Sequence, residues 1–222
     1  MTINLGKALN FPFSDKDWVS KIVLAIVMLF IPFLGWAILA GYFVRTIKNV
    51  MTGNELLPEW DDWGGDLGRG FMAIIGYLIY YAPLILLGCC SSAIADDNAA
   101  FGCGSIVNLL YGVAIAPFLF SAMARFAMTE KFDVFLDISG RFADFNNHTD
   151  EATSLWVNVF ALNVIMFFAV PIGLVLCCIP GLVAIAANVA ITAHLVGQWG
   201  RIIGADGSDG GDASPSIDAA IA

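Results

Sequence analysis

The sequence predicts an all-α, polytopic membrane protein with five to six apolar segments. Of the 222 residues, 59% are hydrophobic, and the mean hydropathy is +0.81, whereas soluble domains contain roughly 45–50% apolar residues. A helix needs about 20 apolar residues to cross a bilayer core about 30 Å thick, so five or six crossings account for nearly the whole chain. We expect residues 1–203 to form one membrane domain and residues 204–222 to form a separate tail.

The first apolar segment, residues 19–44, is interrupted near its middle by Pro32 and Gly35. It could be one kinked helix or a short re-entrant hairpin that enters and leaves the membrane on the same side. The hairpin is favoured, because it places every Lys and Arg on one side and the basic-free loop 91–104 on the other. Each arm is also short for a full crossing. This topology, in a cell membrane, puts both termini in the cytoplasm.

Four further apolar segments follow, each about long enough to cross the membrane once. The sequence Ile179-Pro180-Gly181 supplies a tight turn between the last two, which should therefore form a helical hairpin. The four segments are residues 71–90, 105–126, 155–178 and 182–203.

Residues 130–146 show helical periodicity, with an aromatic face opposite a charged face. We expect this amphipathic helix to lie flat on the cytoplasmic membrane surface, although the same apolar stripe could pack on another protein helix. Its apolar face contains Phe132, Phe135, Leu136, Phe142 and Phe145, and its charged face contains Lys131, Asp133, Asp137, Arg141 and Asp144.

The charge balance is acidic, with 10 Lys and Arg against 19 Asp and Glu. This argues against nucleic acid or anionic lipid headgroups as electrostatic partners. The expected partners are the lipid bilayer, other membrane proteins or further copies of the chain. Residues 204–222 are rich in Gly, Ser and Asp and predict a disordered acidic tail.

An acidic stretch framed by tryptophans precedes the segment 71–90. Carboxylates at this density could bind a hard cation such as Ca²⁺ or Mg²⁺, but their spacing matches no EF-hand, and tryptophans are typical of a membrane edge. A solvated loop is the simplest interpretation, and a docking surface for a partner is the better functional one. The residues are Glu59, Trp60, Asp61, Asp62, Trp63 and Asp66, preceded by Glu55.

Several polar side chains lie within the predicted spans. His194 and Gln198 are four residues apart and share a helix face, and His194 could relay protons or bind a ligand. More simply, these groups join helices by hydrogen bonds. Without a buried carboxylate or basic residue beside them, a proton pump is disfavoured. The polar positions are Asn158, Asn163, Asn188, His194 and Gln198.

All five cysteines fall on the predicted outer side, where one or two disulfides could link the loop to the last hairpin. The alternative is that they are small apolar membrane residues without a bond. Adjacent cysteines lack the gap that lets two thiolates bind one zinc ion, and we expect no metal or cofactor. The cysteines are Cys89, Cys90, Cys103, Cys177 and Cys178.

The stretches NFPFSDKDWVSKI, IPFLGWAILAGYFVRTIKNV and LLPEWDDWGGDLGRG, with the later HLVGQWGRI, resemble an uncharacterised prokaryotic membrane family, the domain of unknown function 4013. The PEWDDW element is its most specific part. The Asp-rich tail and the pI of about 4.4 look like those of a haloarchaeal member. The resemblance implies a multi-pass membrane fold but no activity and no catalytic residue.

The sequence therefore favours a non-enzymatic protein that acts as a scaffold or subunit of a membrane assembly. The alternative is a small transporter or channel for a polar or amphipathic solute, which a polar cavity lined by His194, Asn158 and Asn188 would support. An enzyme is disfavoured, because the sequence contains no phosphate-binding glycine loop, paired-histidine zinc motif or nucleophile elbow.

Overall fold

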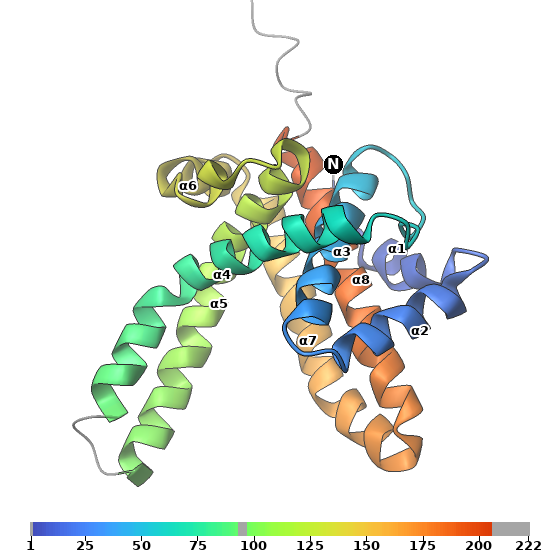
Figure 1. Cartoon of the computed structure of the whole chain (residues 1–222). Coiled ribbons are helices and arrows are strands. Elements are labelled where there is room, and N and C mark those ends of the chain that lie inside the picture. The colour runs from blue at the N-terminus through green and yellow to red at the C-terminus, as the bar shows by residue number, and fades with distance from the viewer. Residues whose placement is uncertain (1, 93–96, 206–222) are drawn as a thin grey trace, which may run out of the picture.

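The computed structural model describes residues 2–92 and 97–205, which contain eight α-helices and no strand. Two long helical hairpins diverge from a common end like an inverted V, and both the N-terminus and the end of the last helix lie at that end (Figure 1). The helices are α1 (Leu5–Asn10), α2 (Trp18–Leu29), α3 (Leu34–Met51), α4 (Trp63–Ser92), α5 (Asp97–Thr129), α6 (Ile138–Asn147), α7 (Thr149–Cys177) and α8 (Ile179–Ile202), with 3-10 turns η1 (Phe11–Phe13) and η2 (Phe132–Phe135).

Within the described residues, four helices are long and apolar enough to cross a membrane, which confirms the predicted class of polytopic helical membrane protein. They are the stretches Trp63–Leu86, Leu110–Thr129, Thr149–Leu176 and Ile179–Ile202. The first apolar region is not among them, because it forms the two shorter helices α2 and α3.

The chain reverses between α2 and α3, as the hairpin interpretation predicted. Pro32 has no backbone N–H with which to continue α2, and Phe33 has a φ of 60°, which is uncommon for a residue with a side chain. The tip of the hairpin exposes Phe30 and Phe33. It reaches only part of the way along the neighbouring α7–α8 hairpin (Figure 1).

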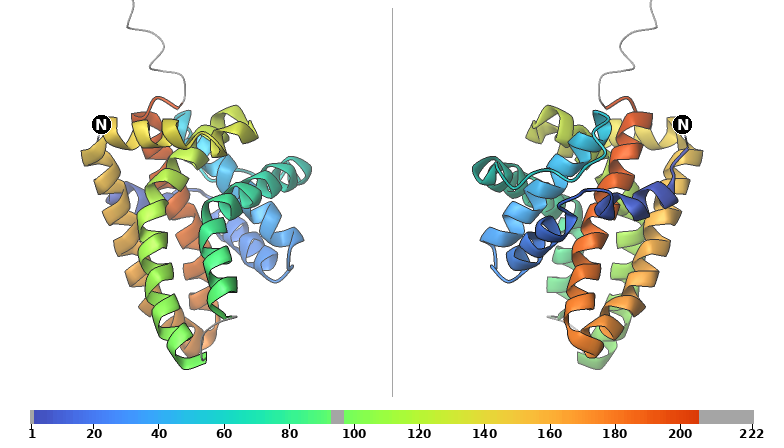
Figure 2. Two further views of the ribbon diagram at one scale, coloured as in Figure 1. Left: turned by 90° about the vertical axis from the view of Figure 1, so that its left-hand side faces the viewer. Right: turned by 90° about the vertical axis from the view of Figure 1, so that its right-hand side faces the viewer.

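Helix α4 begins at Trp63, earlier than the predicted start at residue 71. Its first part lies across α3, and the helix then bends and descends beside α5 (Figures 1 and 2). Pro83 removes a backbone donor in this region, and the Tyr111 hydroxyl donates to the Tyr80 carbonyl at 2.7 Å. The sequence predicted a simple span here. The bend instead divides α4 into a first part that lies across α3, which we call the flat arm, and a second part that runs beside α5, which we call the crossing arm.

Two glycines allow α3 and α4 to cross with their backbones in contact. A Cβ atom on Gly41 would lie 1.8 Å from the Asp66 carbonyl oxygen, and one on Gly70 would lie 1.7 Å from the Ala37 carbonyl oxygen. No side chain occupies such a space, so glycine at these two positions determines where the flat arm of α4 lies.

The predicted amphipathic helix is present but begins later than residue 130. It is preceded by η2, and the Asp137 side chain caps α6 by accepting a hydrogen bond from the Gly140 N–H at 2.9 Å. Phe142 and Leu136 of the predicted apolar face are exposed, whereas Phe135 is fully buried in the main core. Of the predicted charged face, Arg141 and Asp144 are buried and form part of an ion-pair cluster.

Helices α7 and α8 form the predicted hairpin, with the turn slightly earlier than expected. Cys178 has a φ of 61° and connects the two helices, while Pro180 lies in the first turn of α8, where its missing N–H costs no hydrogen bond. A Cβ atom on Gly173 would lie 2.6 Å from the Gly181 nitrogen. Small residues therefore hold the hairpin closed next to the turn.

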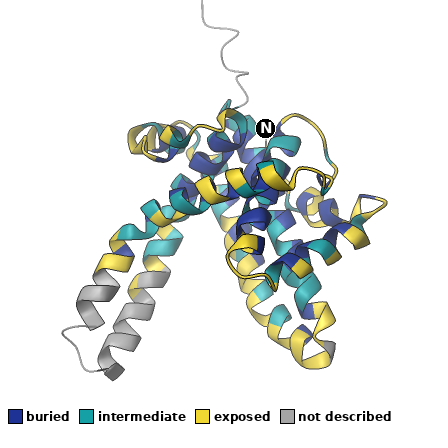
Figure 3. Cartoon of the chain, viewed as in Figure 1, coloured by how far each residue is buried: buried dark blue, intermediate teal, exposed yellow. Residues whose placement is uncertain are grey.

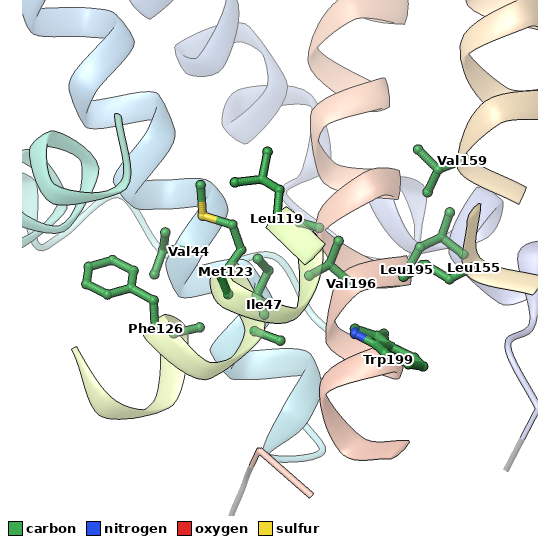
Figure 4. Close-up of a cluster of buried hydrophobic side chains, with 14 of the residues drawn as sticks. Val44, Ile47, Leu119, Met123, Phe126, Leu155, Val159, Leu195, Val196 and Trp199 are labelled. Carbon is green, nitrogen blue, oxygen red and sulfur yellow. The ribbon is translucent and has the colours of Figure 1, made fainter. Parts of the chain in front are cut away.

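The main apolar core lies at the common end, where α3, α5, α7 and α8 converge. Val44, Phe126, Leu155 and Trp199 are fully buried in it (Figure 4), and the Trp199 indole donates to the Ser121 hydroxyl at 2.9 Å. Burial decreases toward the tip of α7–α8 (Figure 3). Only 17% of the apolar window of α7 is buried inside the protein, against 50% for α8, so α7 offers most of its surface to its surroundings.

Candidate functional site

A groove of about 690 Å³ opens between the two long hairpins, with walls from α4, α5 and α7. Nearly all of the side chains that line it are apolar or aromatic. They include Tyr81, Phe120, Trp156, Phe160, Asn163 and Phe168.

Trp156 joins the two hairpins at this groove. Its indole N–H donates to the Val113 carbonyl of α5 at 2.8 Å, and its ring stacks on Phe160 one turn further along α7, with centroids 5.6 Å apart. On the α5 side, Gly112 leaves room for the Tyr81 hydroxyl, which would lie 3.4 Å from a Cβ atom at that position. The groove is therefore open where the hairpins diverge and bridged by Trp156.

The groove lies at the level of the hydrocarbon core if α7 crosses the membrane. The apolar stretch of α7 runs from Thr149 to Leu176, and Asn163 is at its midpoint. The amide nitrogen of Asn163 donates to the Val159 carbonyl of its own helix at 2.8 Å. A polar side chain at this depth is costly unless its hydrogen-bonding groups find partners.

The five polar residues predicted as an intramembrane site do not share one cavity. Among the residues lining the groove, only Asn163 belongs to that set. Asn158 donates to the Ser154 hydroxyl of the same helix at 3.4 Å. Asn188 lies on α8, and its side-chain oxygen is buried without a hydrogen-bond partner in the described part of the chain. The groove therefore contains one of these side chains, Asn163, and lends no support to the predicted polar cavity.

His194 and Gln198 instead attach the N-terminal segment to α8. The Gln198 carboxamide accepts from the Asn4 N–H at 2.7 Å and donates to the Asn4 carbonyl at 3.1 Å. Its nitrogen also lies 2.9 Å from His194 Nδ1, which accepts this bond when the imidazole is neutral. The His194 ring is fully buried and lies 4.7 Å from the Phe11 ring. This arrangement fits the simpler interpretation of hydrogen-bonded contacts, although the joined segments are α8 and the N-terminus.

Glu55 occupies the centre of a charged cluster beside His194. Its carboxylate accepts a hydrogen bond from Lys7 at 2.5 Å and lies 3.7 Å from Arg201 Nη2 and from His194 Nε2. Partial burial alone would raise the pKa of Glu55, but the hydrogen bond from Lys7 and the neighbouring positive charges outweigh it and lower that pKa. The cluster ties together α1, α8 and the segment before α4.

The acidic PEWDDW element is paired with cations from three helices and is not a freely solvated loop. Lys21 of α2 binds Glu59 at 2.6 Å and Asp15 at 2.6 Å. Arg45 of α3 binds Asp61 at 2.5 Å. The hydrogen bond from Arg45 lowers the pKa of Asp61. These contacts neutralise the carboxylates within the chain.

The end of the element lies inside α4, which corrects the expectation of a loop through Trp63 and Asp66. Asp66 is 1% exposed and binds Arg45 and Arg69, each at 2.8 Å, while Asp62 binds Arg69 at 2.6 Å. Among the described residues, no group of three or more His, Cys, Asp or Glu side chains could hold a metal ion. The arrangement therefore gives the cation-binding interpretation no support.

The tryptophans of this element pack on α3. The Trp60 ring stacks on Tyr42 with centroids 4.1 Å apart, and its indole donates to the Lys21 carbonyl at 3.2 Å. Trp63 lies 5.5 Å from Trp60 between ring centroids and is partly exposed. The element is thus a structural junction of α2, α3 and α4, with Glu59 and Asp61 exposed on its outer edge.

The predicted disulfides fall largely outside the described side chains. Those of Cys89, Cys90, Cys103 and Cys177 are among the undescribed ones. Cys178 is an exposed free thiol within the described part. The disulfide between the outer loop and the last hairpin stays a prediction.

These features define a polytopic helical membrane protein with an apolar groove between two hairpins. The common end, where the hairpins meet, carries the ion pairs and is called the polar end below. The model of a protein family of unknown function, DUF4013, matches residues 24–179. The chain therefore belongs to that family, as its sequence motifs indicated.

One curated relative is the uncharacterized protein MJ1189 of Methanocaldococcus jannaschii, which is 45% identical over 42 residues. The match covers 19% of this chain and 15% of the relative. The haloarchaeal character suggested by the acidic tail is not borne out by these matches. No solved structure matches the chain.

Proposed function

We propose that the protein is a non-enzymatic subunit or scaffold of a membrane assembly, and that the groove between α5 and α7 holds a transmembrane helix of a partner protein. The observation that carries this proposal is the groove itself, about 690 Å³ in volume, walled by apolar side chains and placed midway along the crossing stretch of α7.

A groove of this kind suits helix association in lipid. Transmembrane helices gain little from hydrophobic burial, because lipid tails are as apolar as their side chains, and they associate through close packing and a few hydrogen bonds. The aromatic rings of Trp156, Phe160 and Phe168 give a partner helix a large contact area in a concave wall. A helix can lay one face in such a groove.

Transport of a polar solute has less support. A solute pathway needs polar groups along its length, whereas the groove is lined mostly by apolar side chains. The carboxylates of the PEWDDW element and of Asp66 form ion pairs with Lys21, Arg45 and Arg69 at the polar end. Because cations hold these carboxylates, the element is poorly suited to acid–base catalysis, which supports a non-enzymatic role.

We further infer that the polar end faces the cytoplasm. All ten Lys and Arg lie outside residues 70–124 and 142–200, which include the crossing parts of the long hairpins. The positive-inside rule assigns such an end to the cytoplasmic side.

Photo-crosslinking in native membranes tests the groove. Benzoylphenylalanine would replace Phe168, which lines the groove and is 61% exposed, and separately Ile165, which is 60% exposed on the same helix outside the lining. We expect position 168 to give an adduct with one protein, mapped by mass spectrometry to a transmembrane segment, and position 165 to give lipid adducts. Lipid adducts alone at both positions, the same proteins at both, or an adduct with a second copy of this chain would contradict the proposal.

A further inference from the structure

The inference that follows rests on the proposed function and specifies the partner helix. Among the described residues that line the groove, Asn163 is the one amide side chain, and it lies at the midpoint of the 28-residue apolar stretch of α7. Its nitrogen is bonded to the Val159 carbonyl. Within the described part of the chain, no residue donates a hydrogen bond to its oxygen, so among these residues it is an acceptor open to whatever fills the groove.

The acceptor selects among the possible occupants. A polar group in hydrocarbon is costly when it lacks a hydrogen bond, and a lipid acyl chain has no donor to offer. The backbone N–H groups of a transmembrane helix are already used within that helix. A donor must therefore come from a side chain, such as Ser, Thr, Asn or Gln on the occupant.

A second copy of this chain fits the groove poorly. In a two-fold dimer the same surface lies on both sides of the interface, and two concave grooves that face each other leave both unfilled. The occupant must be convex to fill a groove whose α7 wall carries Asn163 between Phe160 and Phe167, one turn to either side. A single helix from another protein has this shape.

We propose that the partner's transmembrane helix presents one hydrogen-bond donor side chain to Asn163, with apolar side chains one turn before and after it. The apolar neighbours pack on the aromatic rings of the groove, and the donor fixes the depth of the partner helix. Asn163 thus sets the register of the complex, and the rest of the groove supplies contact area.

The test combines the crosslinking position 168 with a substitution of Asn163. Asn163→Leu keeps the branched shape of the side chain and removes the acceptor. Asn158→Leu is a matched control on the same helix, because Asn158 bonds within α7 and is not part of the lining. Hydrogen bonds between membrane helices average about 0.6 kcal/mol, so we expect Asn163→Leu to lower the adduct yield about threefold and Asn158→Leu to leave it unchanged. Thermal stability in detergent shows that each variant is folded.

The outcomes separate the two proposals. No protein adduct in the parent chain would overturn the proposed function. A parent adduct whose yield is the same in Asn163→Leu would leave that function standing and overturn the role of Asn163. When the mapped partner donor is replaced by Leu or Ala, the yield should fall in the parent chain but not further in Asn163→Leu, as expected for two coupled residues. An additional fall in that background would also overturn the pairing.

Discussion

The crossing of α3 and α4 predicts opposite effects for two glycines on one helix. Gly68 and Gly70 are two residues apart in α4, but a Cβ atom at Gly68 would meet no atom within 4 Å, whereas one at Gly70 would lie 1.7 Å from the Ala37 carbonyl oxygen. Real Cβ atoms essentially never approach closer than 3.0 Å. Gly70→Ala therefore forces the two backbones apart by more than about 1 Å.

This displacement cannot be absorbed by a rotamer change, because both contacting groups belong to helical backbone. Overpacking of this kind costs roughly 1–3 kcal/mol, and the shift also strains the Arg45–Asp66 ion pair that spans the crossing. Gly68→Ala lacks this penalty and gains helix propensity, so it should stabilise by up to about 1 kcal/mol. The two variants share the same chemical change and differ only in what the added methyl group meets.

Thermal unfolding in detergent, followed by far-ultraviolet circular dichroism, measures both variants beside the parent chain. We expect the midpoint to fall for Gly70→Ala and to stay or rise for Gly68→Ala. Equal midpoints for the two variants, or a fall in Gly68→Ala alone, would refute the close crossing of α3 and α4 and with it the position of the flat arm.

Three further predictions concern the polar end. Lys21→Met leaves the Asp15 carboxylate, which is 8% exposed, without its partner, so it should lower the free energy of unfolding by about 3 kcal/mol, and adding Asp15→Asn should recover part of this in chemical denaturation. The pKa values of Asp15 and Glu55 are lowered in the folded state. Their contribution to the free energy of unfolding is therefore present above their unfolded-state pKa values near 4 and is lost as the pH falls through the lower folded-state values. Glu55→Gln should accordingly flatten the decline of the thermal unfolding midpoint between about pH 5 and pH 2. Gln198→Leu removes both bonds to Asn4 and should weaken attachment of the N-terminal segment by about 1–2 kcal/mol, seen as faster amide exchange over residues 4–10 with unchanged exchange in α7.

The helices and their breaks were predictable because their signals are local. Hydropathy identified the crossing stretches, and Pro32 marked the reversal between α2 and α3, since a missing donor acts on the preceding turn. The flat arm of α4 was missed. Its residues 63–70 are too polar to be counted in the apolar segment, and their helical state depends on a crossing with α3 that only close glycine contacts permit.

The ion pairs could not be predicted from spacing, because their partners are distant in sequence. Lys21 and Glu59 are 38 residues apart, and Arg45 and Asp66 are 21 apart. The sequence showed carboxylates beside tryptophans, and separately it showed basic residues that mark one side of the membrane. It did not show that these basic residues neutralise those carboxylates. The carboxylates, which are one half of this network, have by themselves the composition of a cation site.

The groove was missed for a different reason. Its walls are apolar, and apolar side chains that line a groove have the same composition as side chains that face lipid. One signal was present in the sequence: Trp156 and Asn163 are seven residues apart, so they lie on one face of α7, and that face carries an amide at mid-span. The sequence grouped this amide with His194 and Gln198 as one polar site. The fold separates them, because Gln198 bonds the N-terminal segment, whereas Asn163 lines the groove.

The position of the core explains how the groove can remain open. The hairpins α4–α5 and α7–α8 are packed together at the polar end, around Phe126 and Trp199, and diverge below it (Figure 1). In water, two apolar arms would close on each other, because burial of their facing surfaces is favourable. In a bilayer that gain is nearly absent, since closure only exchanges contacts with lipid for contacts between helices. The angle between the hairpins is then set by the packing at the polar end. The ion pairs and the core at that end therefore determine the width of the groove.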